Sequence, residues 1–200
     1  MKKIMISLSC IVLILSLLGA TVFAAETSNY FALKAGAYFP NSGDLGGFNT
    51  GFNGQAALGH YFTPNIAAEL GLGYFATSGT GSGEFDGVPG TATGDLYAIP
   101  LTLALKAIYP IDKWEIYAIG GVGAYFCNVK VTYSGGSPSN STTAFGGFLG
   151  GGVDYNFARN WFLGVEGTYL WSKPQFTLNN VSGDVAIDGW TVTGNIGFRF

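Results

Sequence analysis

The stretch YAIPLTLALKAIYPIDKWEIYAIGGVGAYF, residues 97–126, holds two alternating apolar segments with a short turn between them. Successive side chains of a β-strand point to opposite faces, so a strand with one buried face repeats with a period of two. The first segment shows that period, with one apolar and one more polar face: Leu101, Leu103 and Leu105 alternate with Thr102 and Lys106. The turn at 110–113 then leads into a second strand. This stretch therefore predicts an antiparallel hairpin with one apolar side.

The same alternation recurs along the chain after residue 25, and no convincing helical period accompanies it. Most of the predicted strands have about the 9 to 11 residues that a tilted strand needs to cross a bilayer. The strands are predicted at 30–39, 52–62, 66–75, 96–109, 114–127, 144–157, 161–171 and 189–200.

The connections between these strands alternate in length. Long connections are predicted at 40–51, 76–95, 128–143 and 172–188, and tight turns at 63–65, 110–113 and 158–160. Antiparallel neighbours place alternate connections at opposite ends of a barrel, so this pattern is typical of a barrel with one elaborated end. The predicted fold class is all-β, an eight-stranded antiparallel up-and-down transmembrane β-barrel over residues 25–200.

The composition indicates which face of the barrel is outside. Only 10% of the residues are charged, against about 25% in soluble domains. Strands facing water would carry more charges than the polar face shows, so we place the apolar face against lipid. Aromatic residues gather near the predicted strand ends, as in the girdles at both membrane interfaces. The absence of basic clusters argues against nucleic acid as a partner.

The predicted lumenal face carries a small set of balanced charges. Charges in so narrow an interior are costly unless they are paired, so we expect salt bridges across the lumen that block it. Arg199 is expected to close this network from the last strand. The predicted lumenal charge network comprises Lys34, Lys106, Arg199, Glu69, Asp154 and Glu166.

The N-terminal segment has the pattern of a secretory signal peptide. Two lysines precede an apolar run that is shorter than the about 20 residues of a membrane-spanning helix. Small residues at Val22 and Ala24 predict cleavage after Ala24, which makes residues 1–24 the signal peptide.

The chain resembles the eight-stranded outer-membrane β-barrel superfamily of Gram-negative bacteria, which contains the opacity-type proteins and the membrane domain of outer-membrane protein A. The pieces that carry the resemblance span nearly the whole mature chain: HYFTPNIAAELGLGYF (60–75), YAIPLTLALKAIYP (97–110), WEIYAIGGVGAYF (114–126) and GGGVDYNFARNWFLGVEGTYLW (150–171). The resemblance implies location in the bacterial outer membrane, with lipid and lipopolysaccharide around the barrel. It also implies an assembly signal read by the barrel-assembly machinery, formed by Val192, Ile196, Phe198 and Phe200.

Three classes of function stay open at this point. The preferred one is a non-enzymatic scaffold that presents four long extracellular loops for adhesion or contact with a host or cell-surface ligand. The alternative is a small porin-like channel or a conduit for apolar solutes, as in the outer-membrane protein W group. The third is a lipid-modifying enzyme, which would have to use the single histidine, His60, on the periplasmic side.

No catalytic, cofactor or metal site is predicted. His60 is interpreted as an interfacial girdle residue. Glu84, Asp86 and Asp95 could bind calcium, but a solvated glycine-rich loop is the preferred interpretation of this segment.

Deletion of Phe200, or Phe200→Asp, is expected to impair assembly, because either change removes an aromatic side chain from the implied recognition signal. The measurement is the amount of folded protein in isolated outer membranes, compared with that of the unaltered chain. Wild-type levels of the variant would contradict the assignment of the signal.

Overall fold

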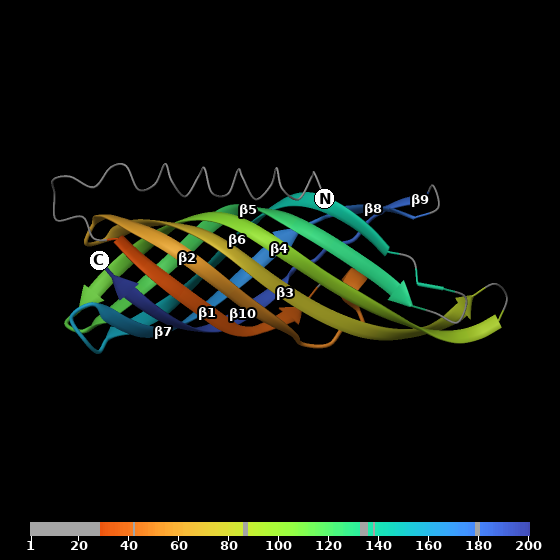
Figure 1. Ribbon diagram of the computed structural model, residues 1–200, viewed down its shortest axis with the longest axis horizontal. Helices are drawn as coiled ribbons and strands as arrows, with labels where there is room; N and C mark the ends of the chain where they lie inside the picture. The colour runs from red at the N-terminus through yellow and green to blue at the C-terminus, as the bar shows by residue number, and fades with distance from the viewer. Residues whose placement is uncertain (1–28, 42, 86–87, 133–135, 138, 179–180) are drawn as a thin grey trace.

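The computed structural model describes residues 29–200 apart from 42, 86–87, 133–135, 138 and 179–180 (Figure 1). The predicted signal peptide at 1–24 lies outside the described residues. Long strands make up the barrel: β1 (Asn29–Pro40), β2 (Gly51–Thr63), β3 (Ile66–Phe85), β4 (Val88–Ile111), β5 (Trp114–Thr132), β6 (Ser139–Asn156), β7 (Trp161–Ser172) and β10 (Gly189–Arg199). The remaining elements lie in connections: the 3₁₀ turn η1 (Gly43–Leu45), β8 (Gln175–Leu178) and β9 (Val181–Asp184).

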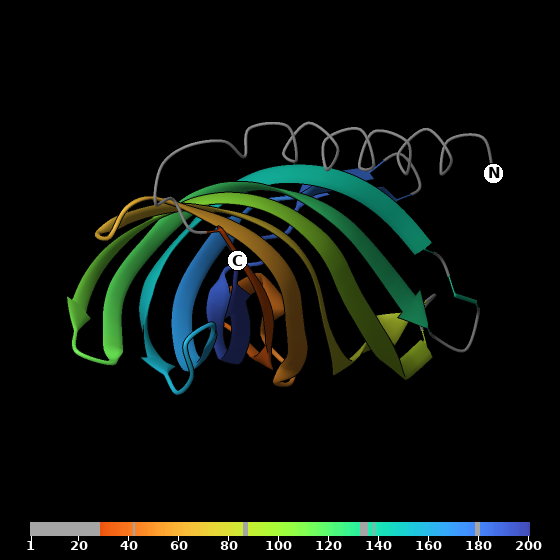
Figure 2. The ribbon, with the colours of Figure 1, turned by 60° about the vertical axis from the view of Figure 1, so that its left-hand side comes forward.

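The eight long strands form one closed barrel, in the order β1-β10-β7-β6-β5-β4-β3-β2, and each is antiparallel to its neighbours. Figure 2 shows the strands wrapping around a common axis. The barrel closes between β1 and β10, in a register that runs from Tyr30↔Arg199 to Pro40↔Gly189. The predicted fold class, an all-β, eight-stranded antiparallel up-and-down barrel, is confirmed.

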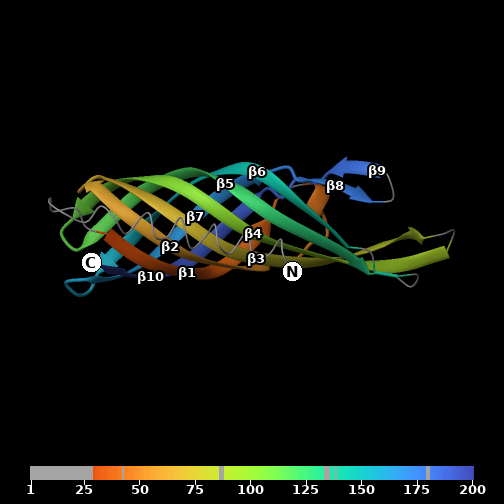
Figure 3. The same ribbon diagram turned by 45° about the horizontal axis from the view of Figure 1, so that its top comes forward.

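The predicted long loops at 76–95 and 128–143 are wrong, because strand residues occupy most of each. The β3–β4 ladder continues to Phe85↔Val88, and β5 and β6 pair as far as Lys130↔Ser139. The β3–β4 hairpin consequently projects beyond the other strands (Figures 1 and 3). Its outer half is rich in glycine, serine and threonine. The two strands pair there through backbone hydrogen bonds, which do not require alternating apolar side chains, so the sequence pattern did not reveal them.

Outward-facing side chains are apolar along the barrel wall. Leu33 and Leu105 are 50% and 62% exposed, whereas their inward neighbours Lys34 and Lys106 are 4% and 5% exposed. Exposed aromatic residues ring the wall toward the long-loop end, at Phe39, Phe52, Tyr74, Tyr97, Phe126, Phe145, Trp171 and Trp190. A second ring lies at the short-turn end, at Phe62, Tyr109, Trp114, Phe157, Trp161 and Phe200.

Glycines on the inward face make room for aromatic rings. A Cβ at Gly59 would lie 1.9 Å from Cζ of Tyr30, and a Cβ at Gly197 would lie 2.0 Å from Cζ of Phe162. The two rings meet edge to face, with centroids 5.9 Å apart. The lumen at the short-turn end is thus packed by large rings that depend on the absence of side chains opposite them.

Gly59→Ala is expected to lower the free energy of unfolding by about 1 to 3 kcal/mol, because overpacking displaces the Tyr30 ring. Gly81→Ala is the matched control, since no heavy atom lies within 4 Å of a Cβ at that strand position. Thermal unfolding of both variants in the same detergent tests this expectation. Equal melting temperatures would show that Tyr30 moves aside without cost.

Candidate functional site: the barrel interior

A cluster of four charged side chains crosses the middle of the lumen. Lys34 of β1 lies 2.6 Å from Glu69 of β3 and 2.9 Å from Glu166 of β7, measured from Nζ to carboxylate oxygens. Lys106 of β4 lies 2.8 Å from Glu69 and 3.9 Å from Glu166. All four face inward because of the period of two in their strands, and their side chains are at most 7% exposed. We call these four residues the ionic cluster.

Tyrosines and an asparagine complete the hydrogen bonding of the ionic cluster. Tyr30 donates its hydroxyl hydrogen to Glu69 at 2.7 Å, and Tyr117 donates to Glu166 at 2.9 Å. The amide of Asn195 donates to the Tyr117 oxygen at 3.3 Å. Nζ of Lys106 also lies 4.4 Å from the centre of the Tyr117 ring. Each carboxylate of the ionic cluster therefore has several donors, which is what a desolvated charge requires.

Arg199 does not close the ionic cluster, contrary to our expectation. Its guanidinium lies 2.8 Å from Glu115 of β5 and donates to Asn156 at 2.6 Å, near the short-turn end. The sequence analysis missed Glu115 because it lies beside the turn at 110–113. Its spacing of two from inward-facing Tyr117 is the signal that could have identified it. This pair is more exposed, at 18% and 14%, than the ionic cluster.

Asp154 lies inside the barrel but belongs neither to the ionic cluster nor to the Arg199–Glu115 pair. It is 4% exposed, and the described part of the chain offers it no ion pair. Its Oδ1 has no hydrogen-bond partner there, and its carboxylate occupies the space above Gly164, where a Cβ would lie 1.9 Å from Oδ1. Among the described residues of the central lumen, the carboxylates of Glu69, Glu115, Asp154 and Glu166 therefore face the cations of Lys34, Lys106 and Arg199.

A small cavity with a mixed polar and apolar lining lies on the long-loop side of the ionic cluster. Its volume is about 60 Å³, enough for a few water molecules. Lys34, Glu69 and Glu166 border one side, and Phe75, Tyr125 and Leu170 border the other. The rest of the lining is mixed, with the polar side chains of Asn53, Gln55, Thr102, Thr168, Thr191 and Thr193 and the non-polar residues Gly73, Pro100, Ile119 and Phe148.

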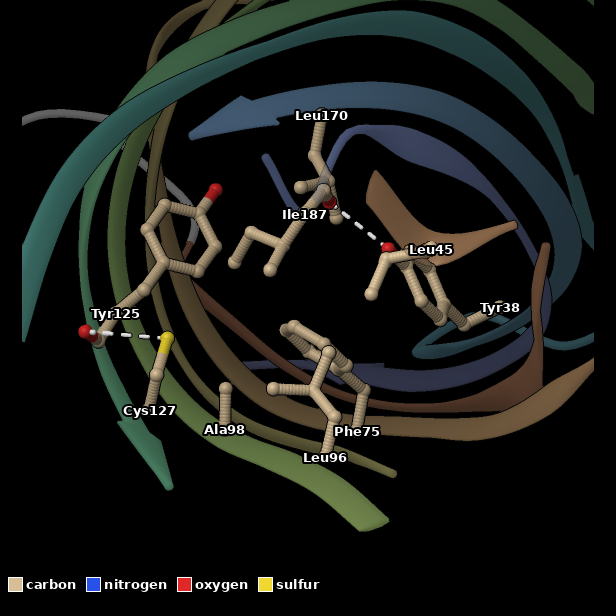
Figure 4. Packing of buried hydrophobic residues seen from close by; sticks show 9 residues of the cluster. All are labelled: Tyr38, Leu45, Phe75, Leu96, Ala98, Tyr125, Cys127, Leu170 and Ile187. Atoms are coloured by element: carbon tan, nitrogen blue, oxygen red, sulfur yellow. Dashed lines mark hydrogen bonds between the residues drawn. The ribbon is translucent and has the colours of Figure 1, made fainter. Parts of the chain in front are cut away.

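A layer of buried apolar side chains packs into the lumen on the far side of this cavity (Figure 4). Two of its members, Leu45 and Ile187, come from connections rather than from barrel strands, and they are 4% and 0% exposed. We call the layer the outer apolar layer; it comprises Tyr38, Leu45, Phe75, Leu96, Ala98, Tyr125, Cys127, Leu170 and Ile187. The sequence analysis did not anticipate it, because an apolar residue in a loop carries no periodic signal.

The residues of the predicted assembly signal lie on the outer wall of β10 and at its end. Val192, Ile196 and Phe200 are 51%, 41% and 62% exposed. Phe198 is half-buried, and its ring lies 5.1 Å from that of Trp161 and 6.4 Å from that of Phe200.

Other candidate chemistry gains no support from the geometry. His60 lies at the short-turn end of β2, where Nδ1 is 2.9 Å from Oδ1 of Asn29 and the ring meets Phe62 edge on. Over the described residues, no group of three or more His, Cys, Asp and Glu side chains could hold a metal ion. Asp86 of the calcium hypothesis lies outside those residues. None of the helices in the described part of the chain has the length and apolar character of a membrane span.

An eight-stranded barrel with an apolar outer wall, aromatic rings near both ends and a lumen filled by side chains defines the class of small outer-membrane barrels. Residues 10–200 match the family described as "Outer membrane protein beta-barrel domain", and the chain belongs to this family. Its outward apolar face is therefore the lipid-facing surface. The chain matches no curated protein sequence.

Solved structures with this fold include outer-membrane proteins of several bacteria. The chain is similar to the outer membrane protein OprG from Pseudomonas aeruginosa, at 16% identity over 88% of this chain and 96% of that chain, with a TM-score of 0.60. A major outer membrane protein from Thermus thermophilus is 13% identical over 88% and 100% of the two chains, with a TM-score of 0.57. Neisserial surface protein A is 12% identical over 88% and 98%, with a TM-score of 0.50. At these identities the likeness is one of fold.

Glu69→Ala is expected to lower the free energy of unfolding by about 3 to 5 kcal/mol, because it leaves two buried ammonium groups short of their shared partner. Arg199→Ala is expected to cost less, since its ion pair is more accessible to water. Lys113→Ala, in an exposed turn, is the control and is expected to stay within about 0.5 kcal/mol of the wild type. Thermal unfolding in detergent ranks the three variants, and a smaller effect of Glu69→Ala than of Arg199→Ala would contradict the assignment.

Proposed function

We propose that this chain is a non-enzymatic integral protein of the bacterial outer membrane, whose closed barrel presents long loops at the cell surface for contact with other molecules or cells. The observation that carries the proposal is the filled lumen. The ionic cluster and the outer apolar layer pack across it on the two sides of a cavity of about 60 Å³. A barrel filled in this way is a support rather than a pore.

The long-loop end supports a role in contact. The outer half of the β3–β4 hairpin projects beyond the barrel, and the β8–β9 hairpin forms a second, separate two-stranded sheet. Glycine, serine, threonine and asparagine dominate these segments, so they offer many hydrogen-bonding groups and few charges. Loops held on a rigid scaffold commonly carry binding activity.

Export and assembly complete the proposal. Residues 1–24 act as the signal peptide, and Val192, Ile196, Phe198 and Phe200 are read by the barrel-assembly machinery during insertion. In the membrane, lipid and lipopolysaccharide surround the apolar wall. The lone histidine, His60, is bound to Asn29 at the periplasmic rim, away from the outer leaflet, which supports a role other than lipid-modifying catalysis.

The competing function is a small channel or a conduit for apolar solutes. The cavity between the two layers favours this alternative, because a conduit needs internal space. Transport along the barrel axis would require both layers to open.

Wild-type protein in planar bilayers is expected to show little steady conductance, because ions would have to cross the apolar layer and then a fully paired charge cluster. An open porin in the same lipid serves as the positive control. Large and stable currents from the purified chain would reject the closed-scaffold proposal and favour the channel.

A further inference from the structure

Asp154 of β6 carries a buried carboxyl group that the ion pairs of the lumen leave out. The side chain is 4% exposed, and within the described chain its Oδ1 meets no hydrogen-bond donor. Gly164 of β7, its register partner, makes the space for this group, since a Cβ there would lie 1.9 Å from Oδ1. The carboxyl group therefore lies in a niche that the barrel wall itself forms.

Glu115 faces Asp154 from the neighbouring strand on the other side. The two residues are register partners in the β5–β6 ladder, and residues directly opposite one another have Cβ atoms about 4.5 to 5.5 Å apart. This glutamate accepts hydrogen bonds from Arg199 at 2.8 Å, from Tyr61 at 3.0 Å and from Asn156 at 3.2 Å. Of two facing carboxyl groups, one thus receives all these donors and the other receives none of them.

The other charged groups that face this part of the lumen are engaged with one another. Glu166 of β7 lies 2.9 Å from Nζ of Lys34 and accepts from the Tyr117 hydroxyl at 2.9 Å. Lys106 of β4 lies 2.8 Å from Glu69. Each cation that the structure describes in the central lumen is thus bound to a glutamate, and none of them pairs with Asp154.

An ionised carboxylate in the niche would be costly. A buried charge that lacks a cation and donors becomes neutral rather than staying charged. A second negative charge directly opposite Glu115 would add repulsion, and where two carboxyl groups share a site, one of them keeps its proton more tightly. A protonated carboxyl group avoids both costs and gains a hydrogen that it can donate.

We propose that Asp154 is a proton-binding site of the barrel interior: at neutral pH its carboxyl group holds one proton, so that the facing pair of Asp154 and Glu115 carries a single negative charge, which Arg199 neutralises. Loss of the proton sets two negative charges against one guanidinium. The barrel thereby contains a pH-sensitive element near its short-turn end. The inference concerns the interior wall alone, so neither the surface role nor the conductance experiment tests it.

Infrared spectroscopy of the purified protein in detergent detects the proton directly. A protonated carboxyl group has a C=O stretching band at higher frequency than a carboxylate or a backbone amide, and the band shifts in heavy water. The wild type is expected to show this band at neutral pH, and Asp154→Asn is expected to lack it. Asp112→Asn, the same change at an exposed turn residue with φ 52°, is the matched control and is expected to keep the band.

The pH dependence of stability gives a second measurement. A solvated aspartate of the unfolded chain ionises at a pH of about 3.9. Between that pH and the pH at which the folded group ionises, the folded chain holds one more proton than the unfolded chain, so stability falls as the pH rises. Relative to Asp154→Asn, the melting temperature of the wild type is therefore expected to fall over this range and to level off where the infrared band is lost.

Two results would overturn the inference. A wild-type spectrum without the band at neutral pH would make Asp154 a hydrated carboxylate, and a band that remains in Asp154→Asn would place the proton on another residue. Should Asp154→Asn not fold, labelling of the aspartate carboxyl carbons of the wild type with a heavy isotope decides. The band is expected to shift, and an unshifted band would overturn the inference as well.

Discussion

Closure of the sheet between β1 and β10 is the constraint on which the rest of the structure depends. A bilayer offers no water to the backbone, so a membrane-crossing sheet cannot leave an open edge. Here the first and last strands pair from Tyr30↔Arg199 onward, and Asn29 and Phe200 exchange reciprocal backbone hydrogen bonds of 2.9 and 2.8 Å. Closing eight strands creates an interior only wide enough for side chains, so closure also dictates that the interior is filled.

The membrane explains why so much of the fold could be predicted from the sequence. Every second side chain of a membrane strand faces lipid and is therefore apolar, as Leu103 and Val165 are. This period of two in the sequence identified all eight barrel strands. Outside the lipid, side chains no longer need to be apolar, but the backbone hydrogen bonds between β3 and β4 continue. The outer half of the β3–β4 hairpin therefore carries no alternating pattern, and its strand character follows only from pairing between Thr80↔Thr93 and its neighbours.

For the candidate site, the sequence predicted which side chains point into the lumen, but not which of them meet. The period of two placed Lys34, Glu69, Lys106 and Glu166 inside, but it carries no information on their heights along the axis, which depend on strand stagger. Stagger puts Arg199 beside Glu115 near the short-turn end, away from the ionic cluster. Ile187 could not be found in this way at all, because a loop residue enters the lumen through tertiary contacts with Tyr38 and η1.

The two layers that fill the lumen are stabilised by different interactions, ion pairs in one and apolar packing in the other, and they come from different parts of the chain. The ionic cluster is carried by four barrel strands of the wall, and losing any one member leaves the other three with an uncompensated buried charge. The outer apolar layer depends on Leu45 and Ile187, which two connections deliver. Changes in those surface loops therefore alter the outer layer without disturbing the ionic cluster. A barrel built this way can vary its external surface while its central ionic cluster stays the same.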